Sequence, residues 1–380
     1  MKDFRHLAPT AIEFGVGKLD LLGEKAAALG ARVMLVTVPW EEPVLGQFER
    51  ALDSLRAARV EVIQYPLAQP NPTVDQVDAG AALAQEEGVE VVIGMGGGSS
   101  IDTAKGIAVA ATHPHSIWDY MFFQDSQPDY RTLPIVAVTT TSGTGAHVTK
   151  VAVITKTDTK CKSAVVSDMI FPQTAIVDPA LMTSLPRAIT ASTTFDAFTH
   201  AFESYINPGA TPMTDLLALE SLRLLGENGL AVLDNPGDLE LRSRLAWADT
   251  LAGLCIANAG TTLPHAMGQP ISGHFPHVSH GQSLAIVYPA FLAYTCSAAA
   301  ERFTTVGKLF DPEVSDCESA VTALVEWITG MGMKISLSDM GIKEEDMAPV
   351  LADCMSFPDV NCNPRVPCAD EVMDMYRSAL

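Results

Sequence analysis

The first half of the chain alternates short apolar, β-rich runs with helical patterns, and this alternation restricts the fold more than any other feature. A run that is apolar at every position indicates a strand buried on both faces. Strands that alternate with helices are typical of a parallel sheet covered by helices on both sides. The expected strands are Ala31–Val38, Val60–Pro66, Val89–Ile93, Leu133–Thr140 and Ala175–Pro179.

The second half of the chain has a different pattern. From about Arg187 onward, helical periodicity continues with almost no β-rich run, and Pro186 interrupts the pattern at the change. A chain of 380 residues also exceeds the usual size of one hydrophobic core, about 250–300 residues. We therefore expect two domains of an α/β plus all-α protein: a Rossmann-like parallel-sheet domain over residues 1–186 and an all-helical domain over 187–380.

Charge and cysteine content narrow the class of partner. The net charge of −21 at pH 7 disfavours nucleic acids and anionic membranes, which are bound through basic patches. No stretch approaches the ~18 uninterrupted apolar residues of a membrane span, and the N-terminus lacks the apolar segment of a secretory signal. The seven cysteines are odd in number and form no Cys-x-x-Cys pair, which favours free thiols. We expect a cytoplasmic protein that acts on a small molecule, with no nucleic acid or membrane as partner.

Two turns carry the pattern of a nucleotide site. GMGGGSSIDTAK (Gly94–Lys105) follows an expected strand and opens an expected helix, so its glycines admit a phosphate and the helix offers N–H donors. It departs from the dinucleotide fingerprint at Ser99, and a purely structural turn is the alternative. TTTSGTGAHVT (Thr139–Thr149) follows another strand; its alternative is a turn that caps the next helix. If the two strands are neighbours, both turns lie at one sheet edge, which favours a cofactor site.

The helical half concentrates metal-binding side chains. Asp196 and His200 are four residues apart, so they lie on the same face of a helix. Four of the nine histidines then fall within Thr261–Ser283, where a His-rich polar loop is the alternative to a ligand cluster. One carboxylate with imidazole donors suits Fe²⁺, Zn²⁺ or another divalent transition ion.

In their order along the chain, these segments resemble the iron-dependent (group III) alcohol dehydrogenases, relatives of glycerol dehydrogenases and dehydroquinate synthases. The resemblance spans nearly the whole chain. The matching segments are PNPT (Pro70–Thr73), GMGGGSSIDTAK, TTTSGTGAHVT, AIVDP (Ala175–Pro179), the helix with Asp196 and His200, AGLCIANAG, PHAMGQP, HGQSLAIVYP and NPR (Asn363–Arg365).

The resemblance implies a metal site and a dinucleotide site. The metal ligands would be Asp196, His200, His265 and His280, with His277 a rival for the last position because the spacing is one residue longer than usual. They would hold Fe²⁺, or Zn²⁺ in its place, and these same residues would form the catalytic centre. The residues implied for NAD or NADP are Val38, Gly96, Gly97, Gly98, Ser99, Asp102, Thr140, Thr141, Thr144 and Lys162.

Three positions depart from the family pattern. Gln269 stands where many members have a histidine linked to proton movement, which leaves His274 or His277 as candidates for that task. His147 stands where members usually have glutamate. Val38 stands where NAD-preferring members often carry aspartate, so the choice between NAD and NADP is open.

The implied activity is reversible hydride transfer between a small primary alcohol or aldehyde and NAD(P), with the metal as Lewis acid. The alternatives are a dehydroquinate synthase-like or glycerol dehydrogenase-like enzyme that acts on a polyol, and a binding protein without activity. The resemblance also implies a homodimer or a larger homo-oligomer.

Overall fold

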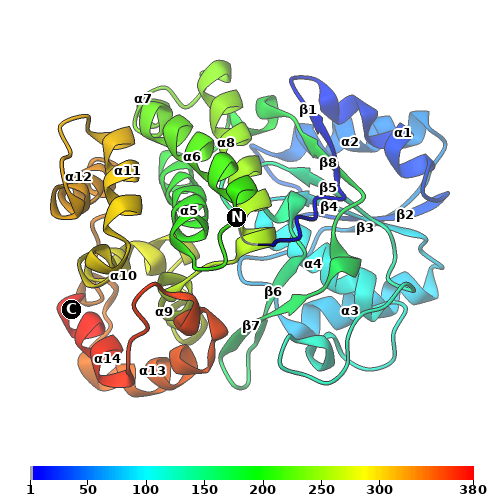
Figure 1. Ribbon diagram of the computed structural model, residues 1–380. Coiled ribbons are helices and arrows are strands. Elements are labelled where there is room, and N and C mark those ends of the chain that lie inside the picture. Colours follow the sequence, from blue (N-terminus) through cyan, green and yellow to red (C-terminus); the bar gives the residue numbers. More distant parts are fainter. Residues whose placement is uncertain (1–2) are drawn as a thin grey trace. The chain divides into compact units, whose positions relative to one another are not determined.

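The structure is a computed structural model and describes residues 3–380 (Figure 1). The chain divides into two compact units. The first covers Ala8–Leu185, and the second covers Pro186–Leu380 together with the described residues before Ala8. The boundary follows Leu185, where the last loop of the α/β unit meets the first long helix of the helical unit.

The first unit is built on a six-stranded sheet in which every pairing is parallel. The chain runs from β2 outward to β3 and then returns to β4 on the other side of β2, so the strand order reverses between β2 and β4. Open α/β sheets bind ligands beyond the carboxyl ends of the strands at such a reversal. In spatial order the strands are β1 (Ala11–Phe14), β8 (Thr174–Val177), β5 (Ile135–Thr139), β4 (Val91–Gly96), β2 (Arg32–Val36) and β3 (Glu61–Tyr65).

Helices cover both faces of this sheet, as its apolar strands require. Met34 and Val36 belong to one hydrophobic core and the intervening Val33 and Leu35 to the other, because successive side chains of a strand point to opposite faces. The first core includes side chains of α3 and α4, and the second includes side chains of α1 and α2. The ribbons of these two pairs of helices lie on opposite faces of the sheet (Figure 1). These helices are α1 (Leu22–Ala27), α2 (Leu45–Ala57), α3 (Val74–Glu86) and α4 (Gly98–Ala110).

The sequence prediction missed three strands. β1 has four residues, none of them fully buried, and so lacks the apolar run of a central strand. The antiparallel hairpin of β6 (Val151–Lys156) and β7 (Cys161–Val166) places polar residues among its apolar ones. The glycine-rich turn therefore follows the fourth strand along the chain rather than the third, and β4 continues into the glycines as far as Gly96.

The second unit contains only helices; within the described residues no strand follows β8. The α/β and helical architecture expected from the sequence is thereby confirmed. The helices are α5 (Arg187–Ile206), α6 (Pro212–Asn228), α7 (Ala231–Asp234), α8 (Leu239–Ala259), α9 (Leu263–His274), α10 (His280–Thr295), α11 (Ala300–Phe310), α12 (Cys317–Gly330), α13 (Met347–Ser356) and α14 (Ala369–Ser378).

One helical run, His280–Phe310, is long and apolar enough to cross a membrane by length and composition, with a mean hydropathy of 1.4. However, 56% of its apolar window is buried inside the protein. The run also comprises α10 and α11 joined by a 3-10 turn rather than one continuous α-helix. These properties are typical of core helices.

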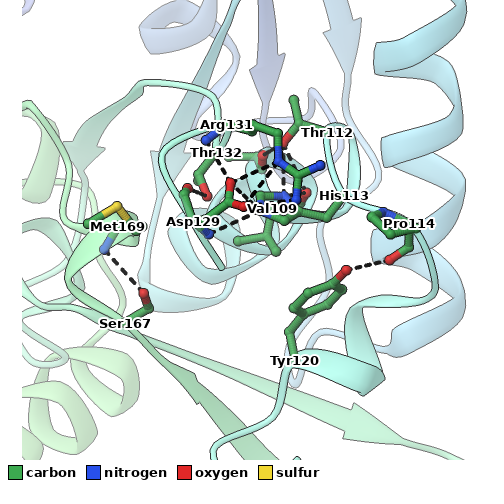
Figure 2. A network of polar contacts seen from close by, with 11 residues as sticks. Val109, Thr112, His113, Pro114, Tyr120, Asp129, Arg131, Thr132, Ser167 and Met169 are labelled. Atoms are coloured by element: carbon green, nitrogen blue, oxygen red, sulfur yellow. Dashed lines mark hydrogen bonds and ion pairs between the residues drawn. The ribbon is translucent and has the colours of Figure 1, made fainter. Parts of the chain in front are cut away.

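A polar network fixes the chain beyond the C-terminal end of α4 (Figure 2). The backbone N–H of Asp129 donates to Nε2 of His113 at 3.0 Å, so Nδ1 carries the proton and donates to the Val109 carbonyl at 2.9 Å. Arg131 in turn binds both carboxylate oxygens of Asp129 and lowers the pKa of that carboxyl well below its usual range. The network ties α4 to the loop that leads into β5.

His113→Ala tests this link. Because His113 is buried, its loss removes the acceptor of the Asp129 N–H and one of the donors to the Val109 carbonyl, which costs about 1–3 kcal/mol of unfolding free energy. Urea denaturation measures the change. Tyr130→Ala, at a side chain that is 88% exposed, is the control and should change stability by less than about 0.5 kcal/mol. If the two substitutions lowered the unfolding free energy equally, His113 would not be the link between α4 and the loop before β5.

Candidate metal and dinucleotide sites

Helix α5 positions three polar side chains inside the helical unit. Asp196, His200 and Glu203 are spaced by four and three residues, so they share one face of the helix, and all three are buried. Phe195 and Phe198 lie on the helix as well, fully buried and in ring contact with Tyr288. These two phenylalanines therefore fill the core.

The ligand-type atoms predicted from the sequence converge around Asp196. Its Oδ1 lies 3.6 Å from Nε2 of His280 and 3.7 Å from Nε2 of His200. Donor atoms of Asp196, His265 and His280 all lie within 4.8 Å of one another. The ring of His200 stacks on that of His265, with centroids 4.9 Å apart. The structure thus brings together side chains from α5, α9 and α10.

Glu203 supports this cluster from behind, and the sequence reasoning missed it. Its Oε1 faces Nδ1 of His265 at 2.9 Å, and its Oε2 accepts from the backbone N–H of Thr262 at 2.8 Å. Burial raises the pKa of the Glu203 carboxyl, against the opposing influence of His265. Burial lowers the pKa of His265, but the charge of Glu203 and the hydrogen bond to it outweigh this effect, so the net shift is upward.

The geometry of the cluster fits a divalent transition ion. A carboxylate acceptor fixes the proton of His265 on Nδ1 and so directs the lone pair of Nε2 away from Glu203. That Nε2 atom is buried and has no hydrogen-bond partner. Ligands at about 2.1 Å from a tetrahedral ion lie about 3.4 Å apart, close to the separations around Asp196. One carboxylate and three imidazoles suit iron or zinc.

The other histidines of this region lie outside the cluster. Nε2 of His277 contacts the carbonyl of Met340 at 3.0 Å on the surface, so the structure gathers His280 rather than its rival. Nε2 of His274 contacts Asp353 at 2.8 Å. Both candidates for proton movement are thus engaged by other residues. Gln269, one helical turn after His265, has a buried side-chain oxygen without a partner.

In the α/β unit, the two predicted turns follow neighbouring strands and interlock. β4 pairs with β5, and a Cβ added to Gly97 would lie 3.3 Å from Thr141. At Gly98 an added Cβ would lie 2.6 Å from Cγ2 of Thr144. Glycine is therefore required here by the second turn. No side chain caps the N-terminus of α4, so its N–H groups are available to an anion.

The remaining residues predicted to bind the cofactor make different kinds of contact within the protein. Lys162 lies near Asn71, donating to its side-chain oxygen at 2.8 Å, and Val38 packs on the core beside β2. Thr140 donates its N–H to the Gly96 carbonyl at 2.9 Å, which joins the two turns. Asp102 accepts from the backbone N–H of Val153 at 3.1 Å and so holds the β6–β7 hairpin.

Two further buried groups lie next to these turns. Lys105 donates to the carbonyls of Thr149 and Val151, each at 2.8 Å, and burial lowers its pKa. Burial also lowers the pKa of His147 to about 3, helped by the charge of Lys105. His147, in place of the usual glutamate, is therefore a neutral, buried residue.

Comparison with known proteins identifies this combination of units. Residues 9–179 match the family described as iron-containing alcohol dehydrogenase, and residues 190–380 match the C-terminal part of the Fe-containing alcohol dehydrogenase family. The chain belongs to the iron-containing alcohol dehydrogenase family. The family resemblance and the enzyme class predicted from the sequence are confirmed: the protein is an oxidoreductase.

Relatives of this dehydrogenase match it over nearly their full length. The NAD-dependent methanol dehydrogenase of Bacillus methanolicus is 32% identical, with 98% of each chain covered. The 1,3-propanediol dehydrogenase of Klebsiella pneumoniae is 33% identical over 99% of this chain and 98% of its own. The crystal structure of an archaeal halo-thermophilic alcohol dehydrogenase from a Red Sea brine pool covers both chains fully, at 34% identity and a TM-score of 0.96.

Glu203→Gln tests the support behind the ligands of this dehydrogenase. The amide keeps the shape of the carboxylate but loses the charge that favours a proton on Nδ1 of His265. We expect metal affinity to fall about 10–100-fold, measured by competition with a chelator. The matched control is Asp353→Asn, which removes the carboxylate facing His274 outside the cluster. An unchanged affinity in the Glu203 variant would show that this residue only fills space.

Gly98→Ala tests the interlocked turns. The added methyl collides with Thr144 and must displace one of the two turns. The dissociation constant for NAD, measured by fluorescence titration, should rise at least about tenfold, or 1.4 kcal/mol. Gly46→Ala on α2, where an added Cβ meets nothing within 4 Å, should leave it unchanged. Wild-type affinity in the Gly98 variant would contradict a nucleotide site at this turn.

Proposed function

We propose that the protein catalyses reversible hydride transfer between a small primary alcohol and the nicotinamide ring of NAD, with a divalent metal at Asp196, His200, His265 and His280. The observation that carries the proposal is the buried, unpartnered Nε2 of His265 among the donors around Asp196. Since a buried polar atom without a partner is costly, a ligand that this nitrogen binds accounts for it.

Iron is the metal that the family description names, and we propose it as Fe²⁺; Zn²⁺ is the alternative that the same donors suit. When bound, either ion supplies Lewis acidity that favours deprotonation of an alcohol and polarises an aldehyde. Neighbouring groups of the protein keep the ligand side chains in the protonation state that metal binding requires. Glu203 holds the proton of His265 on Nδ1, and burial of Asp196 keeps competing water away from its carboxylate.

We infer that the dinucleotide binds at the edge of the parallel sheet in the α/β unit. The uncapped N-terminus of α4 and the backbone of Gly96–Ser99 would receive its pyrophosphate. Thr140, Thr141 and Thr144 would line the adjoining part of the site, and Lys162 would face a ribose. Val38 neither repels a 2′-phosphate nor attracts one, and the name of the Bacillus methanolicus relative favours NAD over NADP.

The proposed substrates are short primary alcohols and diols, together with the corresponding aldehydes. Relatives of similar length and identity are named for methanol and for 1,3-propanediol. Phe195 and Phe198 are fully buried in the core, so they do not select the substrate by direct contact. A homo-oligomer in the cytoplasm remains our expectation for the assembled enzyme.

His265→Ala tests the metal site. The substitution removes one ligand and leaves Glu203 buried beside an empty space. We expect loss of stoichiometric metal and a fall in alcohol-dependent NADH formation greater than the roughly 100-fold effect of losing an outer-shell partner. His274→Ala, outside the cluster, is the control and should keep both. Full metal content and full activity in the His265 variant would show that the site is wrong.

A substrate panel on anaerobically iron-loaded protein, with NAD and NADP in parallel, tests the reaction itself. Net formation of NADH from simple primary alcohols is the expected result. A dehydroquinate synthase-like enzyme would recycle its cofactor and form none. Preference for glycerol over monohydric alcohols would instead support the alternative of a glycerol dehydrogenase-like enzyme that acts on a polyol.

A further inference from the structure

A second group of metal-binding side chains lies in the helical unit, at the opposite end of α10 from the Asp–His cluster. Cys296 opens the 3-10 turn Cys296–Ala299, Cys317 is the first residue of α12, and Glu318 follows it. Ligand atoms of these three residues lie within 4.8 Å of one another. His280 begins α10, whose 16 residues span about 24 Å before Cys296, so the two clusters are separate.

The three side chains combine buried sulfur with an accessible carboxylate. Cys296 is 8% exposed and Cys317 is 6% exposed, whereas Glu318 is exposed. The Cys317 thiol donates to Oε2 of Glu318 at 3.3 Å, and the Cys296 thiol donates to the Ala293 carbonyl at 3.8 Å. A proton on Cys317 thus occupies the position between a sulfur and a carboxylate that a cation could take.

Burial and the neighbouring Glu318 and Cys296 raise the pKa of the Cys317 thiol to about 12, so the thiol keeps its proton until a cation displaces it. The start of α12 acts in the opposite direction and favours the thiolate. The N-terminal turn of a helix stabilises thiolates and carboxylates through its free N–H groups and its dipole. Asp316 already caps the helix, since its side chain accepts from the backbone N–H of Ser319 at 2.8 Å. Cys317 and Glu318 are therefore not needed as the cap and are free to act as ligands.

We propose that Cys296, Cys317 and Glu318 form a binding site for a thiophilic divalent cation such as Zn²⁺ or Cd²⁺. Two thiolates and one carboxylate are ligands of the kind that zinc prefers, and solvent at Glu318 completes the coordination. Binding forms two sulfur–metal bonds and releases the two thiol protons to the buffer, with no change of oxidation state. The ion would join the end of α10 to the start of α12.

Cadmium titration tests this proposal on the iron-loaded protein, kept anaerobic with a reductant that contains no thiol. Thiolate-to-cadmium charge transfer produces an ultraviolet absorption band that aspartate and histidine ligands do not produce. We expect the band to saturate at one Cd²⁺ per chain, to decline when Zn²⁺ is added, and to accompany a higher Tm.

Single substitutions show which residues produce the absorption band. Cys296→Ser and Cys317→Ser should each abolish saturation at one equivalent, and Glu318→Gln should weaken binding while keeping the band. The matched control is Cys255→Ser, because serine can keep the donation that Cys255 makes to the Thr214 carbonyl. That variant should titrate like wild type.

Three results would overturn the proposal. The first is the absence of the band in wild-type protein at saturating Cd²⁺. This result does not depend on whether any variant folds. The second is a band of full intensity in both serine variants. The third is a chain mass that stays two hydrogens below that of the reduced chain even in the presence of the reductant. Such a mass would show that Cys296 and Cys317 form a disulfide instead.

Discussion

The hydrogen bond between Glu203 and His265 is the interaction on which the candidate metal centre depends. A carboxylate buried in the helical core is costly unless it is paired, and Glu203 obtains both an imidazole and a backbone N–H. The same bond sets the tautomer of His265 and aims its other nitrogen at Asp196. The packing of α5 in turn fixes Glu203, because the three phenylalanines on the same helix, Phe195, Phe198 and Phe202, are fully buried.

The α/β unit depends on a different constraint, the close approach of backbone to side chain. Gly97 and Gly98 lie against threonines of the next turn, and the Thr140 N–H joins the turns through Gly96. Lys105 and Asp102 hold the β6–β7 hairpin on the same helix. The proposed site for the pyrophosphate of the dinucleotide is thus made rigid by contacts within the protein itself.

Much of this arrangement follows from the sequence. The apolar runs predicted the central strands, and the spacing of Asp196 and His200 predicted one helical face. Glu203 lies on that face, seven residues after Asp196, and the spacing alone would have indicated it. The sequence alone does not separate His280 from His277, because the turn that brings His280 to Asp196 and leaves His277 on the surface depends on tertiary contacts. The short β1 and the polar β6–β7 hairpin likewise owe their pairing to their neighbours rather than to their own composition.

The contact between Gly98 and Thr144 has a consequence for protein engineering. Because a Cβ added at Gly98 would lie 2.6 Å from Cγ2 of Thr144, the size allowed at each position depends on the residue at the other. The two turns therefore have to change together, although their first residues, Gly94 and Thr139, lie 45 positions apart in the chain. A chimera made with a relative should exchange both segments together, since a crossover between them would pair a turn with a partner to which it was never matched.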